Sequence, residues 1–376
     1  MAHRIILTGG GTGGHVYPAI AVAEQLKKRS DVEGIIYLGV QGHIEEKLAK
    51  ENGLDFVGLK VIGLPRKISL RLFVFPWQLS KAVWQTLKVM KKFKPTVVLG
   101  TGGYAAAPAL SAAVLKKIPI IIHEPDSNPG LVNKAFAPYA KVISLGMAAA
   151  STKFKRLNKK AKIIVNGNPL TERFLHLPSQ QEARQQLDLE PNLPVVLITG
   201  GSQGAQALNQ AVYDMLSFMA SNNTASNFQI LHQVGAKNWS DIESSIAPSL
   251  RNNPLYKPRK YFDNLAIAYA ACDLSICRSG AMTIAELAAT GTPAIFVPYP
   301  FAAADHQTFN AHFVASKGAA KVIMQNDLTG QKLYQEITEL LGCPELKQMR
   351  DHMLALAKPQ AASTLADQLL NLSNKK

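Results

Sequence analysis

Three glycine-rich loops are the features of this sequence that could most directly do chemistry. Each comes straight after a short apolar run, and they read Gly9-Gly-Gly-Thr-Gly-Gly14, Gly100-Thr-Gly-Gly-Tyr104 and Gly200-Gly-Ser-Gln-Gly204. Glycine lets the backbone approach a ligand closely, and a helix after such a loop presents unpaired N–H groups and the positive end of its dipole. The loops therefore predict phosphate binding, although a single loop of this kind could merely connect a strand to a helix.

The first loop also fits the Gly-x-Gly-x-x-Gly pattern of dinucleotide-binding proteins. Such proteins carry an acidic residue about 20 residues further on, at the end of the second strand. Here that run ends in Tyr37-Leu38-Gly39, without an acid. None of the three loops has the Gly-x-x-x-x-Gly-Lys-Ser/Thr pattern of a P-loop. These absences weaken the interpretation as an oxidoreductase.

Two groups of titratable side chains in the first half are placed for acid–base chemistry. His15 closes the first loop, where a neutral imidazole could take a proton from an attacking hydroxyl. The N-terminus of the following helix would favour that neutral form. His123-Glu124-Pro125-Asp126 follows the apolar run 118–122, so we expect it at the ligand-binding edge of a sheet. The alternatives are a capping or packed histidine and ordinary solvated loop charges.

The second half has polar clusters of its own. Arg278-Ser-Gly leads into a helical pattern in which Glu286 could accept two hydrogen bonds from a ribose diol. Glu286 could equally be an ordinary acid in a first helical turn. Asp305-His306-Gln307 forms a further cluster on a loop. Because Asp-x-Asp, His-Glu-x-x-His and clustered cysteines are missing, the sequence predicts no metal site. Helix N-termini and loop amides would then have to stabilise a diphosphate leaving group.

Short apolar runs alternate with helical patterns and would position these residues. The runs suit strands that are buried on both faces of a parallel sheet, so the sequence predicts an α/β fold. The pattern restarts at Val195, and 376 residues suggest two domains, which we place at 1–166 and 167–345, followed by a helical segment at 346–376. The expected strands are 4–8, 34–38, 97–99, 118–122, 142–145, 163–165, 195–199, 229–234, 274–277, 294–297 and 320–323.

The positive charge of the chain is concentrated in its first half. The net charge is +15, and no acid lies between Asp55 and Glu124, a window that holds 11 Lys or Arg. Residues 64–94 mix these cations with apolar and aromatic side chains, which suits an anionic membrane surface. RNA binding and a core helix with a basic face are the alternatives. No run reaches about 18–20 apolar residues, so we expect no transmembrane helix. The three cysteines indicate a reducing compartment.

Taken together, the motifs resemble those of one family. Gly9 through Pro18, Gly100 through Tyr104, His123-Glu124, Asn166-Gly-Asn-Pro169, Gly200 through Ala205 and Arg278 through Glu286 occur in the order of the MurG family. These are the bacterial UDP-N-acetylglucosamine:lipid I N-acetylglucosaminyltransferases of glycosyltransferase family 28. The likeness covers nearly the whole chain and is weakest at 150–190, 236–258 and the C-terminus.

The resemblance implies both a fold and a reaction. The fold is GT-B: two Rossmann-like domains with parallel sheets face each other across a cleft, and the C-terminal helix packs back on the first domain. The reaction is inverting transfer of GlcNAc from UDP-GlcNAc to the 4-hydroxyl of MurNAc in undecaprenyl-diphospho-MurNAc-pentapeptide (lipid I). The product, lipid II, is used for peptidoglycan synthesis. The resemblance implies neither a cofactor nor an active-site metal.

The resemblance also implies partners and a location. The first domain would bind the acceptor and the membrane, and the second would bind UDP-GlcNAc. The enzyme would sit peripherally on the cytoplasmic face of the bacterial inner membrane, with cell-wall synthesis enzymes as candidate partners and no nucleic acid. The residues expected at the acceptor or membrane are Gly102, Gly103, Tyr104, Arg66, Lys67, Arg71, Phe73, Phe75 and Trp77.

Site residues carry over position by position. His15 and Glu124 are the catalytic candidates, with His15 as the base for the muramoyl hydroxyl and Glu124 at the acceptor site. In the second domain, Phe262 would contact uracil through its backbone, Glu286 the ribose and Gln307 the sugar. The full set expected at the donor is Thr12, Gly13, Gly14, Asp126, Arg173, Gly201, Ser202, Gln203, Phe262, Ala281, Met282, Thr283, Ile284, Ala285, Glu286 and Gln307.

The chain departs from the family pattern at three places. Asp126 stands where the family commonly has a donor-contacting Asn, and Thr171 stands where it usually has Arg, so that Arg173 becomes the candidate. Thr308 follows Gln307 where the family has a pair of glutamines near the sugar. Two other functions remain open from the residues alone. One is a UDP-GlcNAc epimerase of the same fold, which would need no lipid acceptor, and the other is a non-catalytic nucleotide- or RNA-binding protein.

Overall fold

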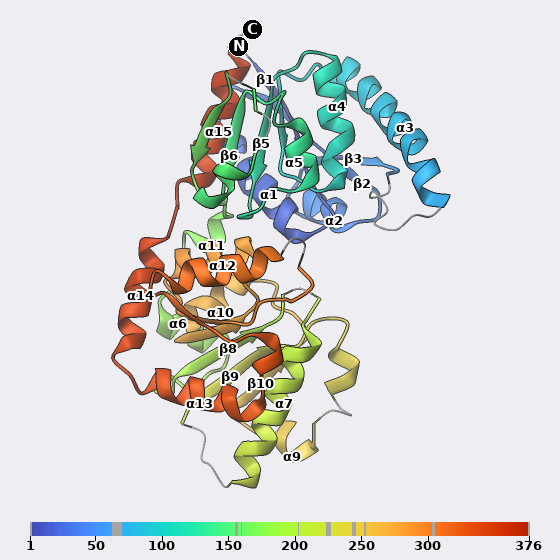
Figure 1. Ribbon diagram of the computed structural model, residues 1–376. Coiled ribbons are helices and arrows are strands. Elements are labelled where there is room, and N and C mark those ends of the chain that lie inside the picture. The colour runs from blue at the N-terminus through green and yellow to red at the C-terminus, as the bar shows by residue number, and fades with distance from the viewer. Residues whose placement is uncertain are drawn as a thin grey trace. The chain divides into compact units, whose positions relative to one another are not determined.

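The structure is a computed structural model that describes residues 2–61, 70–154, 157–158, 160–201, 203–222, 227–242, 246–251, 253–302 and 305–374. The chain forms two compact units, residues 1–172 with 358–376 and residues 173–357. Figure 1 shows that each unit is a sheet covered by helices on both faces. Ser202, Arg66 and Lys67 lie outside the described residues, as do the side chains of Arg71 and Phe73.

The first unit is built on a parallel sheet. Its strands follow the order β3-β2-β1-β4-β5-β6-β7. The strands are β1 (His3–Thr8), β2 (Val32–Val40), β3 (Asp55–Leu59), β4 (Val97–Gly100), β5 (Ile120–Glu124), β6 (Val142–Leu145) and β7 (Lys162–Val165). The helices are α1 (Gly13–Lys27), α2 (Ile44–Glu51), α3 (Leu70–Phe93), α4 (Ala107–Leu115), α5 (Leu131–Phe136) and α15 (Ala361–Ser373).

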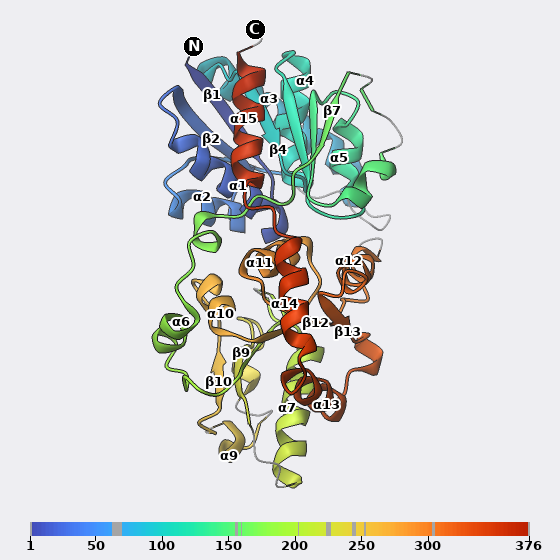
Figure 2. The ribbon, with the colours of Figure 1, turned by 90° about the vertical axis from the view of Figure 1, so that its left-hand side faces the viewer.

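Two hydrophobic layers hold this sheet. One face packs α1 and α15 against residues such as Ile5, Leu7 and Leu99, and the other packs α4 against Ile6 and Val98. Figure 2 shows α15 running alongside α1, although more than 300 residues of sequence separate them. Because Leu365 and Leu369 of α15 are fully buried in this layer, the C-terminal helix is part of the core of the first unit.

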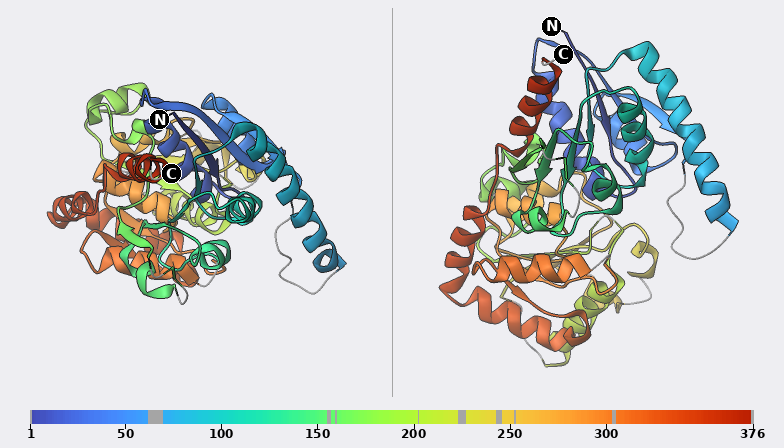
Figure 3. Two further views of the ribbon diagram at one scale, coloured as in Figure 1. Left: turned by 90° about the horizontal axis from the view of Figure 1, so that it is seen from above. Right: turned by 45° about the horizontal axis from the view of Figure 1, so that its top comes forward.

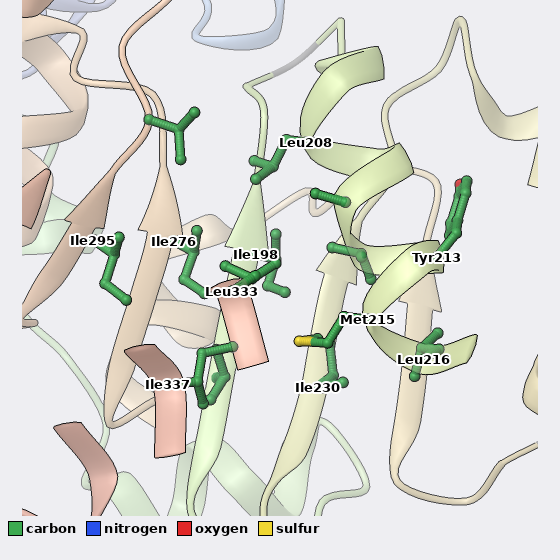
Figure 4. Close-up of a cluster of buried hydrophobic side chains, with 14 of the residues drawn as sticks. Ile198, Leu208, Tyr213, Met215, Leu216, Ile230, Ile276, Ile295, Leu333 and Ile337 are labelled. Carbon is green, nitrogen blue, oxygen red and sulfur yellow. The ribbon is translucent and has the colours of Figure 1, made fainter. Parts of the chain in front are cut away.

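The second unit repeats the design with a second parallel sheet, in the order β10-β9-β8-β11-β12-β13. Its strands are β8 (Val195–Thr199), β9 (Gln229–Gln233), β10 (Tyr256–Arg259), β11 (Leu274–Cys277), β12 (Ala294–Phe296) and β13 (Ala320–Val322). Its helices are α6 (Gln180–Gln186), α7 (Gln206–Ser221), α9 (Pro248–Arg251), α10 (Leu265–Ala271), α11 (Ala281–Thr290), α12 (His306–Ala315), α13 (Gly330–Leu341) and α14 (Glu345–Ala355). Figure 4 shows isoleucines of four neighbouring strands beneath side chains of α7 and α13.

The division of the chain differs from the expected one at both boundaries. Residues 167–172 belong to the first unit, because Gly167 lies directly against Lys358 and the Asn166 amide donates to the carbonyl of Ala361. Helix α14 belongs to the second unit, where it packs against α11, so that the return to the first unit begins at residue 358 rather than at 346. The chain therefore crosses between the units twice, near 172 and near 358.

Candidate active site

Each sheet has a point at which its strand order reverses, and the predicted loops lie there. In the first unit β1 and β4 are neighbours, and the chain continues from them toward opposite edges of the sheet. In the second unit β8 and β11 have the same relation. Ligands of open α/β sheets bind beyond the carboxyl ends of the strands at such a point. All three glycine loops follow these strands, and the segment Arg278-Ser279-Gly280 after β11 joins them.

One ring nitrogen of His15 forms a hydrogen bond to the protein backbone. Its Nδ1 lies 3.0 Å from the carbonyl oxygen of Thr101, and the Thr101 hydroxyl donates back to the carbonyl of His15 at 2.5 Å. A carbonyl can only accept, so Nδ1 carries the proton. In the neutral ring the lone pair is then on Nε2, which is the form that a general base requires.

Two glycines of the second loop make room for this ring. Gly102 and Gly103 have φ of +99° and +74°, in the region that favours glycine. A Cβ on Gly102 would lie 2.8 Å from Nδ1 of His15, and one on Gly103 would overlap the carbonyl oxygen of Gly10. The glycines predicted at the acceptor therefore have a structural task as well, because they let the two loops pack together around His15.

Glu45 supports the first loop from beneath, and sequence reasoning missed it. It stands in the first turn of α2, is fully buried, and accepts hydrogen bonds from the N–H groups of Gly11 at 3.4 Å and Val40 at 3.2 Å. A Cβ on Gly10 would overlap this carboxyl group. The loop then opens α1 with Thr12 as its N-cap, so that Gly13, Gly14 and His15 form the first turn. N–H groups of a first turn lack partners within the helix and can receive an anion.

Glu124 is the last residue of β5 and is buried, with 1% of its surface exposed. It accepts hydrogen bonds from the Asn133 amide at 2.8 Å, from Gly130 N–H at 2.9 Å and from Asp126 N–H at 3.1 Å. Burial raises the pKa of Glu124 to about 7, although the Asn133 hydrogen bond opposes the rise. Glu124 thus organises the turn that carries Asp126, and it titrates near neutral pH.

His123 is also buried within β5 rather than placed on a loop. It contacts the Ser144 hydroxyl at 2.9 Å and the Asn168 carbonyl oxygen at 3.1 Å. Burial lowers the pKa of His123 to about 4, so the ring is neutral at physiological pH. This network joins β5 and β6 to Asn166 and Asn168, so His123 and the Asn166–Pro169 motif form one buried cluster.

In the second unit, the loop after β8 is held by Gln233 at the end of β9. Its amide nitrogen donates to the Thr199 hydroxyl and to the carbonyl of Gly201, both at 3.1 Å. Its carbonyl oxygen accepts the N–H of Phe262 at 3.0 Å. Since that N–H is already donated to Gln233, a backbone contact from Phe262 to a ligand has to use its carbonyl. Gln203 belongs to the same loop, which Gly201 enters with φ of +86°.

Glu286 and Arg173 lie in the second unit and interact. Burial raises the pKa of Glu286 to about 8, and the positive charge of Arg173 opposes this rise. Arg173 also donates to the carbonyl of Asp263 at 3.2 Å. The structure therefore brings together two residues that the sequence assigned separately to the donor. Glu286 lies in the first turns of α11, which begins after its N-cap Gly280, and is preceded there by Ala281, Met282, Thr283, Ile284 and Ala285.

Gln307 is fixed at the start of α12. Its side-chain oxygen accepts the N–H of Tyr299 at 3.0 Å, and its backbone carbonyl accepts the buried Ser279 hydroxyl at 2.7 Å. Arg278 donates to the carbonyl oxygens of Val297 and Pro298, and burial lowers the pKa of its guanidinium. These contacts tie the segment after β11 to the segment after β12, so that both line the carboxyl edge of the second sheet.

Helix α3 carries the described part of the basic, apolar stretch. Figure 3 places it on the outer side of the first unit, beyond α4. Trp77 and Trp84 are 64% and 58% exposed, and the ammonium groups of Lys81 and Lys88 lie over their rings at 5.2 and 3.4 Å from the centroids. Phe75 is half-buried. Among the described residues, no helix is long and apolar enough to cross a membrane.

Comparison with known proteins identifies the family. The Glycosyltransferase family 28 N-terminal domain matches residues 5–144, and the Glycosyltransferase family 28 C-terminal domain matches residues 195–368. The chain belongs to glycosyltransferase family 28. A similar protein of Halothermothrix orenii is 39% identical over 96% of this chain and 97% of its own length. It is named UDP-N-acetylglucosamine--N-acetylmuramyl-(pentapeptide) pyrophosphoryl-undecaprenol N-acetylglucosamine transferase.

Solved structures agree with this family 28 assignment. The crystal structure of Acinetobacter baumannii MurG is 30% identical, covers 99% of this chain and 100% of its own, and has a TM-score of 0.75. A UDP-N-acetylglucosamine 2-epimerase, with a TM-score of 0.72 over 100% of this chain and 98% of its own, is 14% identical and so shares the fold alone. The expected GT-B fold and glycosyltransferase class are therefore confirmed.

The packing of the two loops around His15 generates a prediction for family 28 activity. Gly103→Ala should lower kcat about 10²-fold, because the added methyl group displaces the loop that fixes His15, and small displacements of catalytic groups cost that much. Gly342→Ala is the control, at the end of α13 in the second unit: its φ is −87°, and no atom lies closer than 3.4 Å to the added Cβ. Steady-state kinetics with circular dichroism would check both variants. Equal kcat in the two would contradict the assigned role of Gly103.

Proposed function

We propose that this chain transfers GlcNAc from UDP-GlcNAc to the 4-hydroxyl of MurNAc in undecaprenyl-diphospho-MurNAc-pentapeptide. The observation that carries the proposal is the setting of His15, whose Nδ1 is bonded to Thr101 and whose Nε2 is the basic atom. It lies at the reversal point of the first sheet, beside a helix N-terminus. The printed name of the Halothermothrix relative, at 39% identity over nearly the whole chain, supports the choice of substrates.

In the proposed reaction, each unit acts through groups at its own reversal point. Nε2 of His15 takes the proton from the muramoyl hydroxyl, and the oxygen attacks the anomeric carbon of GlcNAc from the face opposite UDP. The bond from that carbon to the diphosphate breaks, so the configuration inverts and UDP leaves with the electron pair. The Gln203 N–H and N–H groups of the first turn of α11 would stabilise the diphosphate charge, since the N–H groups of Gly201 and Gly204 are already donated within the loop.

The donor site is proposed in the second unit. Glu286 would accept hydrogen bonds from the ribose hydroxyls, the Phe262 carbonyl would face uracil, and Gln307 would contact the sugar. Asp126 and the N–H groups of Gly13 and Gly14 belong to the first unit, and we propose them near the transferred sugar and phosphates. Glu124, buried beneath Asp126, would act through the shape of the 125–130 turn.

Helix α3 is proposed as the part that meets the membrane. Exposed tryptophans backed by lysines, in a window of sequence without acids, match the chemistry of an anionic bilayer surface. Attachment would be peripheral, on the cytoplasmic face of the inner membrane where the lipid-linked acceptor is expected. Cell-wall synthesis enzymes remain proposed partners.

The transfer itself is tested with purified chain, UDP-GlcNAc and a lipid I analogue. We expect acceptor-dependent release of UDP and a β-1,4-linked disaccharide product, followed by mass spectrometry. His15→Ala should lower kcat by about 10²–10⁴-fold, the usual contribution of a general base, with little change in UDP affinity. UDP-GlcNAc alone is the control that separates transfer from epimerisation. Absence of turnover with a sound acceptor would refute the proposal.

A second prediction concerns pH. A carboxyl group with a pKa raised to about 8 is largely protonated at pH 7. Only the ionised form can accept from both ribose hydroxyls with both of its oxygens and without offering a competing donor. UDP affinity should therefore increase as the pH rises from about 7 to 8.5, by up to about tenfold per unit below the pKa. Calorimetric titration of wild type and Glu286→Gln would check this, since the amide cannot ionise. The same pH profile in both proteins would rule Glu286 out as the titrating group.

A third prediction concerns α3. Replacing Trp77 and Trp84 by Ser should weaken sedimentation with anionic vesicles by about tenfold or more, because two exposed rings lose their place at the interface. UDP binding should stay unchanged, since both exposed side chains lie on α3 and neither belongs to the residues proposed at the donor. Tyr139→Ser is the matched control, an aromatic that is 54% exposed elsewhere in that unit. If the control loses as much binding as the double variant, α3 is not the membrane contact.

A further inference from the structure

Gln233 joins two parts of the second unit that are expected to contact different parts of one ligand. Its side-chain NH₂ group bonds the phosphate loop at Thr199 and Gly201, and its oxygen bonds the backbone of Phe262. The side chain is 2% exposed, so these three bonds are made away from water. Loss of any of these hydrogen bonds would leave a buried polar group unpaired, so each bond contributes more to the stability of the loop than an exposed one would.

The amide chemistry explains why this position is glutamine. Thr199 accepts the N–H of Gly201 at 3.2 Å and the Gln233 amide through the same hydroxyl oxygen. The carbonyl of Gly201 accepts both Gln233 and the N–H of Gly204. On its other side, Gln233 has to offer an acceptor to a backbone N–H. Among side chains of this length only an uncharged amide supplies two donors and an acceptor at once.

We propose that Gln233 is a positioning residue that sets the distance between the phosphate loop and the base-contacting backbone at Phe262. It thereby selects a ligand in which a diphosphate is joined to a pyrimidine nucleoside. The inference rests on the proposed donor site and adds to it a residue that itself contacts no ligand. Gly201 has φ of +86° with open space around it, so the loop depends on such bonds to keep its conformation.

The same strand supplies a matched control. Gln229 begins β9, is fully buried, and makes a comparable set of bonds to the backbone of Glu190 and Leu193. Because it stands at the amino end of the strand, it lies at the edge of the sheet opposite the loops. Gln229→Met should therefore lower thermal stability as Gln233→Met does, without changing nucleotide binding.

The experiment measures binding of uridine, UMP and UDP to the full chain by calorimetry. Gln233→Met should weaken UDP binding about tenfold or more, with part of the loss already present for uridine. Thr199→Val removes bonds on the loop side alone, so uridine affinity should stay within about twofold while the UDP-to-uridine affinity ratio falls about three- to tenfold. Thr199→Val also keeps the test decisive if Gln233→Met fails to fold.

Steady-state kinetics distinguish a positioning role of Gln233 from a general destabilisation of the fold. Both site variants should raise KM for UDP-GlcNAc and leave KM for the lipid acceptor unchanged. If Gln229→Met shifts the uridine series as Gln233→Met does, or if Thr199→Val weakens uridine and UDP equally, the inference is overturned. Failure of the proposed donor site looks different, since wild type itself would then gain no affinity from uridine to UDP.

Discussion

The fold depends on hydrogen-bond partners for the backbone N–H and C=O groups of its loops, because these groups have no partners within a strand or helix. An unpaired buried N–H or C=O group costs about 1–3 kcal/mol, so loops at the centre of a sheet need partners from elsewhere. Here buried side chains supply them. Glu45 holds the N–H of Gly11, Thr101 holds the backbone of Thr8 and His15, and Gln233 holds Gly201. The glycines allow the backbones of the loops to approach their neighbours closely, and these polar side chains fix the loops in one conformation.

Burial also sets the protonation states that a transferase needs. Burial inside β5 lowers the pKa of His123, so that its ring stays neutral. The same burial raises the pKa of the neighbouring Glu124 to about 7. Burial raises the pKa of Glu286 further, to about 8, and the positive charge of Arg173 opposes that rise. In each unit, burial therefore moves the pKa of one carboxyl group from its usual acidic range to about neutral pH or above.

Sequence patterns predicted the centre of each sheet better than its edges. The runs at 142–145, 195–199 and 274–277 are strands with those bounds, because strands buried on both faces are continuously apolar. Strands β3 and β10 were missed: both are edge strands, and Gly58, Lys257 and Pro258 break their apolar pattern. The loops carrying His15 and Gly201 were found from their glycines. Glu45 and Gln233 were not found, because the loop residues that they hold lie about 30 residues away in the sequence and only the folded chain brings them together.

The double crossing near 172 and 358 has a consequence for synthesis. The second unit is an insertion between β7 and α15, and all of its residues leave the ribosome before α15 does. The first unit is begun first and finished last, since part of one face of its sheet, beside α1, stays uncovered until Leu365 and Leu369 arrive. Nascent chains would thus expose an apolar sheet face for the time taken to translate about 190 residues, roughly 10–40 s at common elongation rates. A chain that stops short of α15 would retain a complete second unit attached to an unfinished first one, and would be a natural substrate for chaperones and proteases.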